Sequence, residues 1–168
     1  MKSQIDRLDK KILSMITQDA RVPYLEVARE CGVSGAAIHQ RVQKLEQMGV
    51  LQGSAFIIDT YRIGYCTCAY IGIMINDLSK YNAVVKALSN LQEIVECHSV
   101  TGHYALMVKV YAKNNRDLRD IIIKRISKID GISGTETLQI SLDELFSRQL
   151  APFDNLSDDD HSVLELVD

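Results

Sequence analysis

Between residues 66 and 141 the spacing of apolar residues switches repeatedly between the period of a strand and that of a helix. These switches predict the order β-α-β-β-α-β, the split βαβ or ferredoxin-like arrangement. Two helices then cover one face of a four-stranded antiparallel sheet, and the other face needs a separate cover, most simply a second copy of the chain. The predicted segments are, in order, CTCAYIGIMI, a helix with Tyr81, Val84, Val85 and Leu88, EIVECHSV, YALMVKVY, a helix with Leu118, Ile121, Ile122, Ile126 and Ile129, and ISGTETLQIS.

The first fifty residues have a helical pattern throughout. An apolar stripe predicts one helix from about residue 5 to residue 20, and YLEVAREC predicts a short second helix. The third, GAAIHQRVQKLEQMG, follows Ser34, a good N-cap, and ends at Gly49. Two helices joined by CGVS and preceded by a stabilising helix form a helix-turn-helix. The expected fold class is therefore α+β, with a helix-turn-helix domain followed by a ferredoxin-like domain.

The third predicted helix carries small and polar residues on the side that its apolar stripe leaves exposed. Gln and Arg can contact base edges in a major groove, Lys suits phosphate, and small alanines allow a close approach to DNA. The alternative is a solvated outer face, which any three-helix unit has. The spacing of the turn together with the polar helix favours double-stranded DNA as the partner. The candidate DNA-binding residues are Ser34, Ala36, Ala37, His39, Gln40, Arg41, Gln43 and Lys44.

The charge is unevenly distributed along the chain. The formal net charge is −3, but residues 1–53 carry eight Lys or Arg against six Asp or Glu, a net of +2. Residues 154–168 carry six acids and no Lys or Arg, so the chain without this tail would be +3. A net charge of +2 neutralises few phosphates, and dimerisation is the natural way to double the contacts.

Cysteine, histidine and acidic residues do not follow the pattern of a metal site or a catalytic centre. The four cysteines include no Cys-x-x-Cys pair, so we expect buried, reduced thiols. There is no Ser-His-Asp spacing, phosphate loop or pair of carboxylates in the predicted core, so we expect no catalytic residue, metal or cofactor. No apolar run approaches the roughly 20 residues that span a bilayer, and the N-terminus lacks a signal-peptide core, which predicts a cytoplasmic protein without membrane contact.

Two long segments, LDKKILSMITQDARVPYLEVARECGVSGAAIHQRVQKLEQMGVLQG and VVKALSNLQEIVECHSVTGHYALMVKVYAKNNRDLRDIIIKRISKIDGISGTETLQIS, resemble the two halves of the Lrp/AsnC (feast/famine) transcriptional regulators. The resemblance runs from about Ile5 to Leu150 and implies a winged helix-turn-helix domain followed by a RAM or ACT-like domain. It also implies a homodimer formed through the ferredoxin-like domains, commonly assembled into an octamer. The implied effector is an amino acid. VSGAAIHQRV, IGYCTCAYIGI, TGHYALMVKV and IDGISGTETL are most similar to asparagine-responsive members, which makes asparagine the first candidate.

The resemblance places the effector site at the loop after the second strand of the sheet domain. Gly102 can expose backbone N–H groups to a carboxylate, and Thr135 and Thr137 project two hydroxyls to one side of the last strand. The alternatives are a plain turn and threonines chosen for β-propensity alone. The candidate ligand-binding residues are Thr101, Gly102, His103, Tyr104, Ala105, Thr135 and Thr137.

The chain departs from the family pattern at several positions. Many members have an acid in or just after this loop, where His103 and Ala105 stand, so an acid from elsewhere, backbone carbonyls or water would have to bind a ligand amino group. Glu136 is the nearest acid in sequence, but strand alternation puts it on the face opposite Thr135 and Thr137, which leaves it no obvious role. Many members also have Pro where Gly35 stands, and the acidic tail lies outside the family core.

The sequence therefore predicts a sequence-specific DNA-binding transcriptional regulator modulated by a small effector. A ligand-independent architectural DNA-binding protein would share this fold, and ferredoxin-like domains also host enzymes, although this chain offers no catalytic set. The expected organisation is a DNA-binding domain at 1–50, a strand and linker at 51–65, a ligand-sensing and oligomerisation domain at 66–153, and an acidic tail at 154–168.

Overall fold

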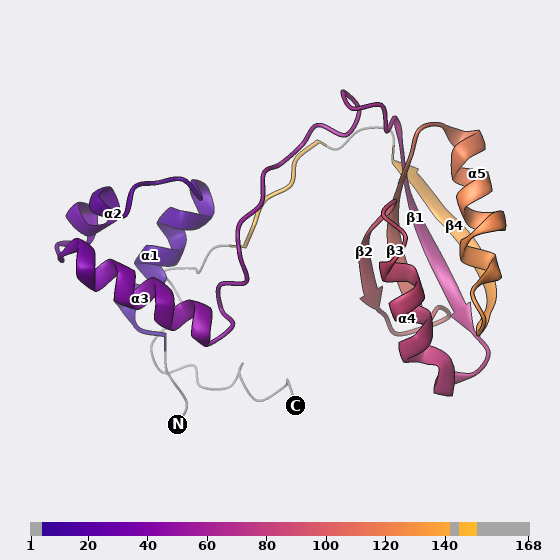
Figure 1. Cartoon of the computed structure of the whole chain (residues 1–168), viewed down its shortest axis with the longest axis horizontal. Helices are drawn as coiled ribbons and strands as arrows, with labels where there is room; N and C mark the ends of the chain where they lie inside the picture. Colours follow the sequence, from indigo (N-terminus) through magenta and orange to yellow (C-terminus); the bar gives the residue numbers. More distant parts are fainter. Residues whose placement is uncertain (1–4, 142–144, 151–168) are drawn as a thin grey trace. The chain divides into compact units, whose positions relative to one another are not determined.

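The computed structural model describes residues 5–141 and 145–150, which divide into two compact units (Figure 1). The first unit comprises residues 5–56 and 147–150, and the second comprises residues 57–141 and 145–146. The tail expected at 154–168 lies outside the described residues. No helix in the described ranges combines the length and the apolar character that crossing a membrane requires.

The first unit contains the helices α1 (Arg7–Gln18), α2 (Tyr24–Cys31) and α3 (Gly35–Gln47). Their apolar stripes meet in one core, in which Ile12, Val27 and Ile38 are fully buried. Helix α1 begins with a capping box: the Asp6 carboxylate accepts a hydrogen bond from the Asp9 amide, and the Asp9 carboxylate accepts one from the Asp6 amide. The predicted helix-turn-helix is confirmed.

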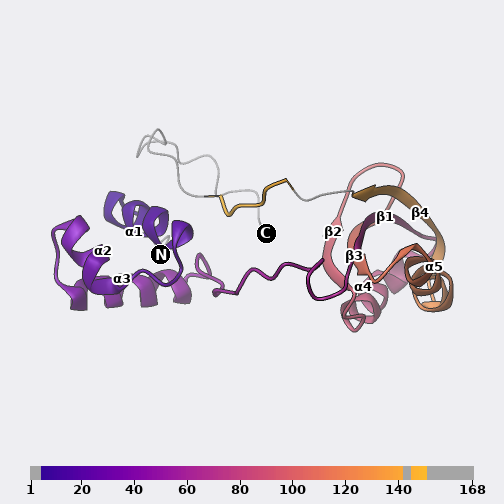
Figure 2. The ribbon, with the colours of Figure 1, turned by 90° about the horizontal axis from the view of Figure 1, so that it is seen from above.

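The second unit is a four-stranded antiparallel sheet with the strand order β2-β3-β1-β4. Helices α4 and α5 lie on one side of the sheet (Figure 2). The predicted β-α-β-β-α-β order is confirmed, with two added 3-10 turns, η1 and η2. The elements are β1 (Thr67–Ile75), η1 (Leu78–Lys80), α4 (Tyr81–Ser89), β2 (Ile94–Ser99), β3 (Leu106–Ala112), α5 (Asn115–Lys124), η2 (Ile126–Lys128) and β4 (Ile132–Ser141).

The two faces of the sheet have different surroundings. One face packs on the helices, and Ile71 and Val108, which lie on it, are both fully buried. The opposite face, called the open face below, carries the alternating residues of the same strands, among them Tyr70, Met74 and Met107, which are half-buried. Period-two alternation along β1 and β3 therefore fixes which side chains each face presents.

Two expectations from the sequence are wrong in this structure. Residues 51–59 have no regular secondary structure and residues 60–64 form a turn, so no strand forms within 51–65. An extended segment becomes a strand only when a partner strand pairs with its backbone, and this segment has none within the described chain. The cysteines are also less buried than expected: Cys66 and Cys97 are exposed because Cys66 precedes β1 and Cys97 lies on the edge strand β2.

Candidate functional site

The turn between α2 and α3 holds α3 as the second helix of the helix-turn-helix. Gly32 ends α2 in the left-handed conformation (φ 69°), and its amide donates to the carbonyls of Ala28 and Arg29. Ser34 then caps α3, because its hydroxyl oxygen accepts a hydrogen bond from the Ala37 amide at 3.2 Å. A glycine-containing turn followed by a capped helix is the local geometry that a DNA-recognition helix requires.

The outward face of α3 contains most of the residues predicted to contact DNA. Packing of Ile38, Val42 and Leu45 into the core leaves the remaining side of the helix to solvent. The ring of His39 meets the ring of Tyr24 edge-on, with centroids 4.7 Å apart. The exposed candidates are Ser34, Ala36, His39, Gln40 and Gln43, and Ala37 is half-buried.

Arg41 and Lys44 are directed at α1 rather than outward. Arg41 donates hydrogen bonds to the carboxylates of Asp6 and Asp9, at 3.0 Å for Asp9, and Lys44 Nζ lies 3.6 Å from Asp9. The side chain of Asp9 is fully buried, whereas Arg41 keeps about a third of its side chain exposed. The expectation that Arg41 belongs to the outward face is therefore wrong, because a buried carboxylate on α1 takes its guanidinium.

The contacts between Asp6, Asp9 and Arg41 favour the ionised forms of Asp6 and Arg41. Burial alone would raise the pKa of the Asp6 carboxyl, but hydrogen bonds from Arg41 and the Asp9 amide bring that pKa below its ordinary value. The hydrogen bonds to Asp6 and Asp9 raise the pKa of Arg41. We call Asp6, Asp9 and Arg41 the α1–α3 ion cluster. Sequence reasoning missed it, although Asp9 stands on the apolar stripe of α1 between Ile5 and Ile12.

The predicted effector loop connects β2 to β3 and is closed by a hydrogen bond from the Val100 amide to the Ala105 carbonyl at 3.4 Å. Thr101, Gly102 and His103 are exposed, and Gly102 has a φ of 114°, which favours glycine. Within the described chain, the amides of residues 101–104 donate no hydrogen bond. Four consecutive amides without a protein acceptor make this loop a candidate for binding an anionic group.

Tyr104 lies across the open face of the sheet. Its ring covers Gly72 of β1, where a Cβ atom would lie 2.5 Å from Tyr104 Cδ1. Its hydroxyl donates a hydrogen bond of 2.7 Å to Glu136 of β4, and that bond raises the pKa of Tyr104. The ring of His103 meets the Tyr104 ring edge-on, with centroids 5.0 Å apart. Glu136 therefore has a hydrogen-bond partner, Tyr104. In the sequence, the isolated Gly72 within the apolar pattern of β1 was the signal that another group approaches the strand closely.

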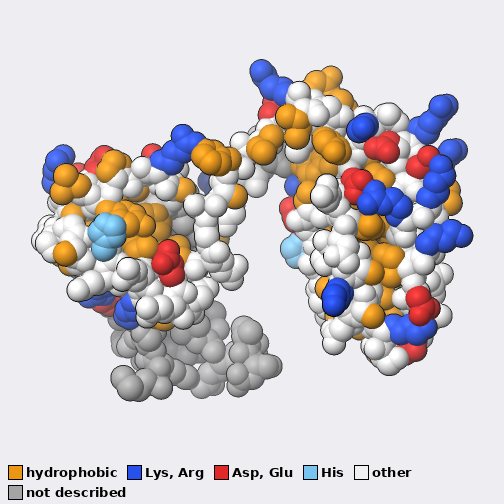
Figure 3. Space-filling view, in the orientation of Figure 1, with side chains coloured by type: hydrophobic (Ala, Val, Ile, Leu, Met, Phe, Trp, Pro, Cys, Tyr) orange, Lys and Arg blue, Asp and Glu red, His pale blue; other side chains and the backbone are white. Residues whose placement is uncertain are grey.

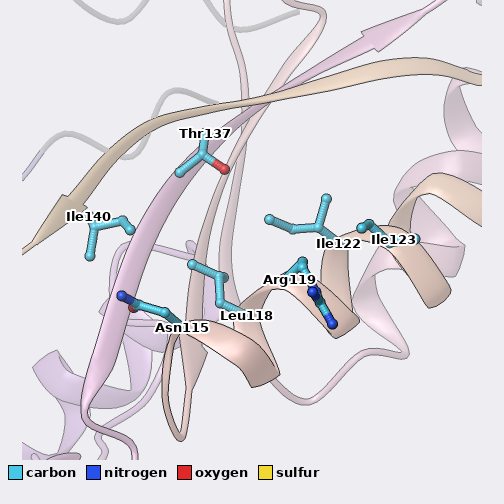
Figure 4. Close-up of a pocket in the computed structure, with 7 residues that line it drawn as sticks. All are labelled: Asn115, Leu118, Arg119, Ile122, Ile123, Thr137 and Ile140. Carbon is cyan, nitrogen blue, oxygen red and sulfur yellow. The ribbon is translucent and has the colours of Figure 1, made fainter.

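Thr135 and Thr137 lie on the other face of the sheet. They pair with Ile73 and Ile71 of β1, which face the helices, whereas Glu136 pairs with Gly72 on the open face. Figure 4 shows Thr137 among residues of α5, in a groove with Leu118 and Ile122. Within one chain the two threonines therefore lie on the face opposite Tyr104, apart from the other candidate ligand-binding residues, since directly paired residues share a face.

The arrangement offers binding surfaces more readily than reactive groups. Among the described residues, no three His, Cys, Asp or Glu side chains come close enough together to hold a metal ion. The first unit has a capped helix with an exposed polar face, of the kind that enters the major groove of DNA. The second unit has a loop of backbone amides without protein acceptors, beside the open face of the sheet. Fold and site together define a two-domain regulator with one DNA-binding unit and one ligand-binding unit.

Comparisons with known proteins support that class for both units. Residues 5–52 match the family model described as winged helix-turn-helix DNA-binding, and residues 68–150 match that of the Lrp/AsnC ligand binding domain. The regulatory protein AsnC of Haemophilus influenzae is 40% identical over 148 residues, which cover 88% of this chain and 98% of that protein. AsnC of Escherichia coli is 35% identical over the same length, 88% of this chain and 97% of its own.

Solved structures agree with the sequence comparison. The structure of E. coli AsnC superposes with a TM-score of 0.79 at 35% identity and covers 88% of this chain and 99% of its own. The feast or famine regulatory protein of M. tuberculosis, complexed with L-methionine, gives a TM-score of 0.81 at 28% identity with the same coverage. The chain belongs to the Lrp/AsnC family of transcriptional regulators. Its relatives are regulatory proteins that carry a DNA-binding domain.

Proposed function

We propose that this chain regulates transcription by binding DNA sequence-specifically through α3, and that an amino acid bound in the second unit changes its assembly or its affinity for DNA. The observation that carries the DNA-binding half is the exposed, capped N-terminal half of α3 in a member of this family. An effector acts on DNA binding only if it binds one assembly state or conformation better than another.

The DNA contacts are assigned to the outward face of α3. Gln40 and Gln43 can form two hydrogen bonds each with adenine edges, while Ser34 and His39 can reach phosphates or bases. Ala36 and Ala37 keep the start of the helix narrow enough for close approach. Lys44 can still contribute positive charge near the backbone, whereas Arg41 is assigned to the α1–α3 ion cluster.

Replacing Gln40 with alanine tests this assignment. We expect specific binding to weaken by about 1–3 kcal/mol, or roughly tenfold or more, because a two-bond base contact is lost. Binding to unrelated DNA should stay within about twofold, because that binding depends on phosphate contacts. Electrophoretic titration of a selected operator and of random DNA measures both. Equal weakening on both DNAs, or no weakening on either, would exclude Gln40 as a base-reading residue.

The effector site is assigned to residues 101–105, with the amides of the loop receiving the carboxylate of an amino acid. Asparagine is the first candidate because of the similarity to AsnC proteins, and the M. tuberculosis relative complexed with L-methionine supports amino acids as the class. Glu136, through its contact with Tyr104, supplies a carboxylate near the loop for the ligand's amino group. Thr135 and Thr137 are left out of this site within one chain.

Replacing Gly102 with aspartate should abolish effector binding while leaving DNA binding intact, because a new carboxylate would repel the ligand carboxylate. Gly102→Asn is the matched control, since it imposes the same backbone strain at φ 114° without the charge. Isothermal titration against the twenty amino acids, first on the unsubstituted protein, measures the difference. Heat with none of them up to several millimolar would exclude a sensor of free amino acids, and equal binding by both variants would exclude this loop as the site.

Assembly and location complete the proposal. A homodimer formed through the open face of the sheet, assembled further into an octamer, would cover Tyr70, Met74 and Met107 and double the DNA contacts. We place the protein in the cytoplasm, acting without enzymatic chemistry, metal or cofactor. Gel shifts with and without effector separate this regulator from a ligand-independent architectural protein, for which affinity, stoichiometry and bending of DNA would all stay unchanged.

A further inference from the structure

Two aromatic rings meet at the surface of the first unit, one from α2 and one from α3. Tyr24 is the first residue of α2, and its ring meets that of His39 with centroids 4.7 Å apart and planes at 77°. Tyr24 is half-buried and packs against the core of the unit, whereas His39 is exposed. Figure 3 shows histidine at the surface of this unit beside hydrophobic side chains, a class that there includes tyrosine.

The polar atoms of this ring pair have no protein partner among the described residues. Neither the Tyr24 hydroxyl nor a ring nitrogen of His39 forms a hydrogen bond with any of them. The hydroxyl also reaches solvent, although the rest of the tyrosine is half-buried. The edge-on contact restricts the rotation of both rings, so the polar groups are held in place before a ligand arrives. Groups that are ordered in advance lose less entropy on binding.

The ring pair lies at the edge of the face assigned to DNA. His39 is about 100° around α3 from Gln40, on the side that contacts α2. Arg41 is directed to the other neighbour, α1, where it binds Asp9. In a helix-turn-helix the second helix lies in the major groove, while the first helix crosses the backbone. Tyr24, at the start of that first helix, and His39, at the edge of the second, are therefore placed to meet a phosphate rather than a base.

We propose, on the basis of the DNA binding proposed above, that Tyr24 and His39 together bind one phosphate of the DNA backbone. The hydroxyl and an imidazole N–H donate hydrogen bonds to the oxygens of the same phosphodiester, and the ring contact keeps the two donors at a fixed spacing. Phosphate contacts set the register and orientation of a protein on the duplex. Tyr24, which lies outside α3, therefore helps to fix how the recognition helix enters the groove.

Tyr24→Phe tests the proposal, because it removes the hydroxyl and keeps the ring that contacts His39. Affinity for a selected operator and for random DNA should fall by the same factor, about three- to tenfold, since the lost hydrogen bond reads no sequence. Urea unfolding should show unchanged stability. Tyr61→Phe, the same change at an exposed tyrosine of the second unit, is the matched control and should leave DNA binding unchanged. Unchanged affinity in Tyr24→Phe would overturn the proposal, because a purely structural ring contact predicts that result.

Operators that carry one neutral methylphosphonate linkage at a time identify the phosphate. A methyl group there replaces one phosphate oxygen and removes the charge, so the unsubstituted protein should bind more weakly wherever it contacts that linkage. At one linkage this loss should become smaller in Tyr24→Phe and in His39→Ala, and the linkage should be the same for both variants. If the loss at every linkage is the same in all three proteins, neither side chain binds a phosphate and the proposal is wrong.

The unsubstituted protein and Gln40→Ala separate a failure of DNA binding from a failure of the phosphate contact. If the unsubstituted protein binds no duplex, the proposed function is wrong and the phosphate contact is excluded with it. If Gln40→Ala weakens operator binding alone and Tyr24→Phe changes nothing, α3 reads bases and only the phosphate contact is excluded. Weakening by Tyr24→Phe on the operator alone would make Tyr24 a base-reading residue, which would also contradict the proposal.

Discussion

Replacing Arg41 with methionine is expected to lower the free energy of unfolding of the first unit by about 2–4 kcal/mol. Methionine keeps the apolar stem of the side chain but removes the guanidinium that binds Asp6 and Asp9. Asp9 is fully buried, and among the described residues the substitution leaves its carboxylate with the Asp6 amide and with one cation, Lys44, 3.6 Å away. Breaking a buried pair by removing one partner costs more than the pair itself contributes, because the remaining charge stays desolvated.

The same substitution should weaken binding to all DNA sequences by a similar factor. Arg41 joins α3 to α1, so its loss changes how firmly the recognition helix is held and removes no base contact. Urea unfolding followed by circular dichroism, together with titration of operator and random DNA, measures both effects. Arg29→Met is the control, since Arg29 is exposed on α2 and has no ion pair among the described residues. A loss confined to one base position, at unchanged stability, would restore Arg41 to the base-reading face.

Asp9→Asn tests whether the unpaired buried carboxylate of Asp9 causes the loss of stability in Arg41→Met. In the Arg41→Met background, Asp9→Asn should recover part of the lost stability, whereas in the unsubstituted protein Asp9→Asn should destabilise. Lowering the pH should also reduce the free energy of unfolding of the first unit, as Arg41→Met does. Because the pKa of Asp6 is lowered in the folded state, its contribution is present above the ordinary aspartate pKa and is lost as the pH falls through the lower, folded value.

The helices and strands were predictable because the signals that form them are local. Apolar spacing, the Ser34 cap and the turn glycine Gly32 each act within a few residues, and the structure shows them where the sequence placed them. The direction of Arg41 was not predictable in this way. Its position on α3 is compatible with an outward side chain, and only the packing of α1 beside α3 brings Asp9 within reach. A long, flexible side chain such as that of Arg41 can bind a group on a neighbouring helix, and helical periodicity does not predict which group it binds.

The loop between β2 and β3 likewise shows which features local sequence determines and which depend on tertiary packing. Strand alternation correctly separated Glu136 from Thr135 and Thr137, but it could not tell which face the loop residues would join. The path of the β2–β3 loop settles this by laying Tyr104 over Gly72, on the side of Glu136. The stretch at 51–59 is a further case, since its sequence favours a strand but the described part of the chain provides no partner strand.

Adding a single methyl group at Gly72 is the sharpest test of the Tyr104 arrangement. In Gly72→Ala the new Cβ would lie 2.5 Å from Tyr104 Cδ1 and 2.6 Å from Cγ, in the rigid inner part of the ring. Tyr104 must therefore move off the open face, which breaks its hydrogen bond to Glu136. We expect a loss of about 1–3 kcal/mol in the free energy of unfolding, together with weaker effector binding. The pKa of Tyr104 should fall toward that of an ordinary tyrosine.

Two comparisons show whether the contact with Tyr104 causes these changes. Gly134→Ala is the matched control: Gly134 pairs with Met74 on the same face, and its new Cβ would lie 2.8 Å from Cε of Met74, the end of a flexible side chain that can move away. It should cost little stability and leave effector binding unchanged. In a Tyr104→Ala background, Gly72→Ala should cost almost nothing, because no ring remains to be displaced. An undiminished cost there would show that Gly72 is required by the strand itself, and Tyr104 would then be a residue that merely lies nearby. Urea unfolding of the four proteins in this cycle, with isothermal titration of the effector, decides between the two.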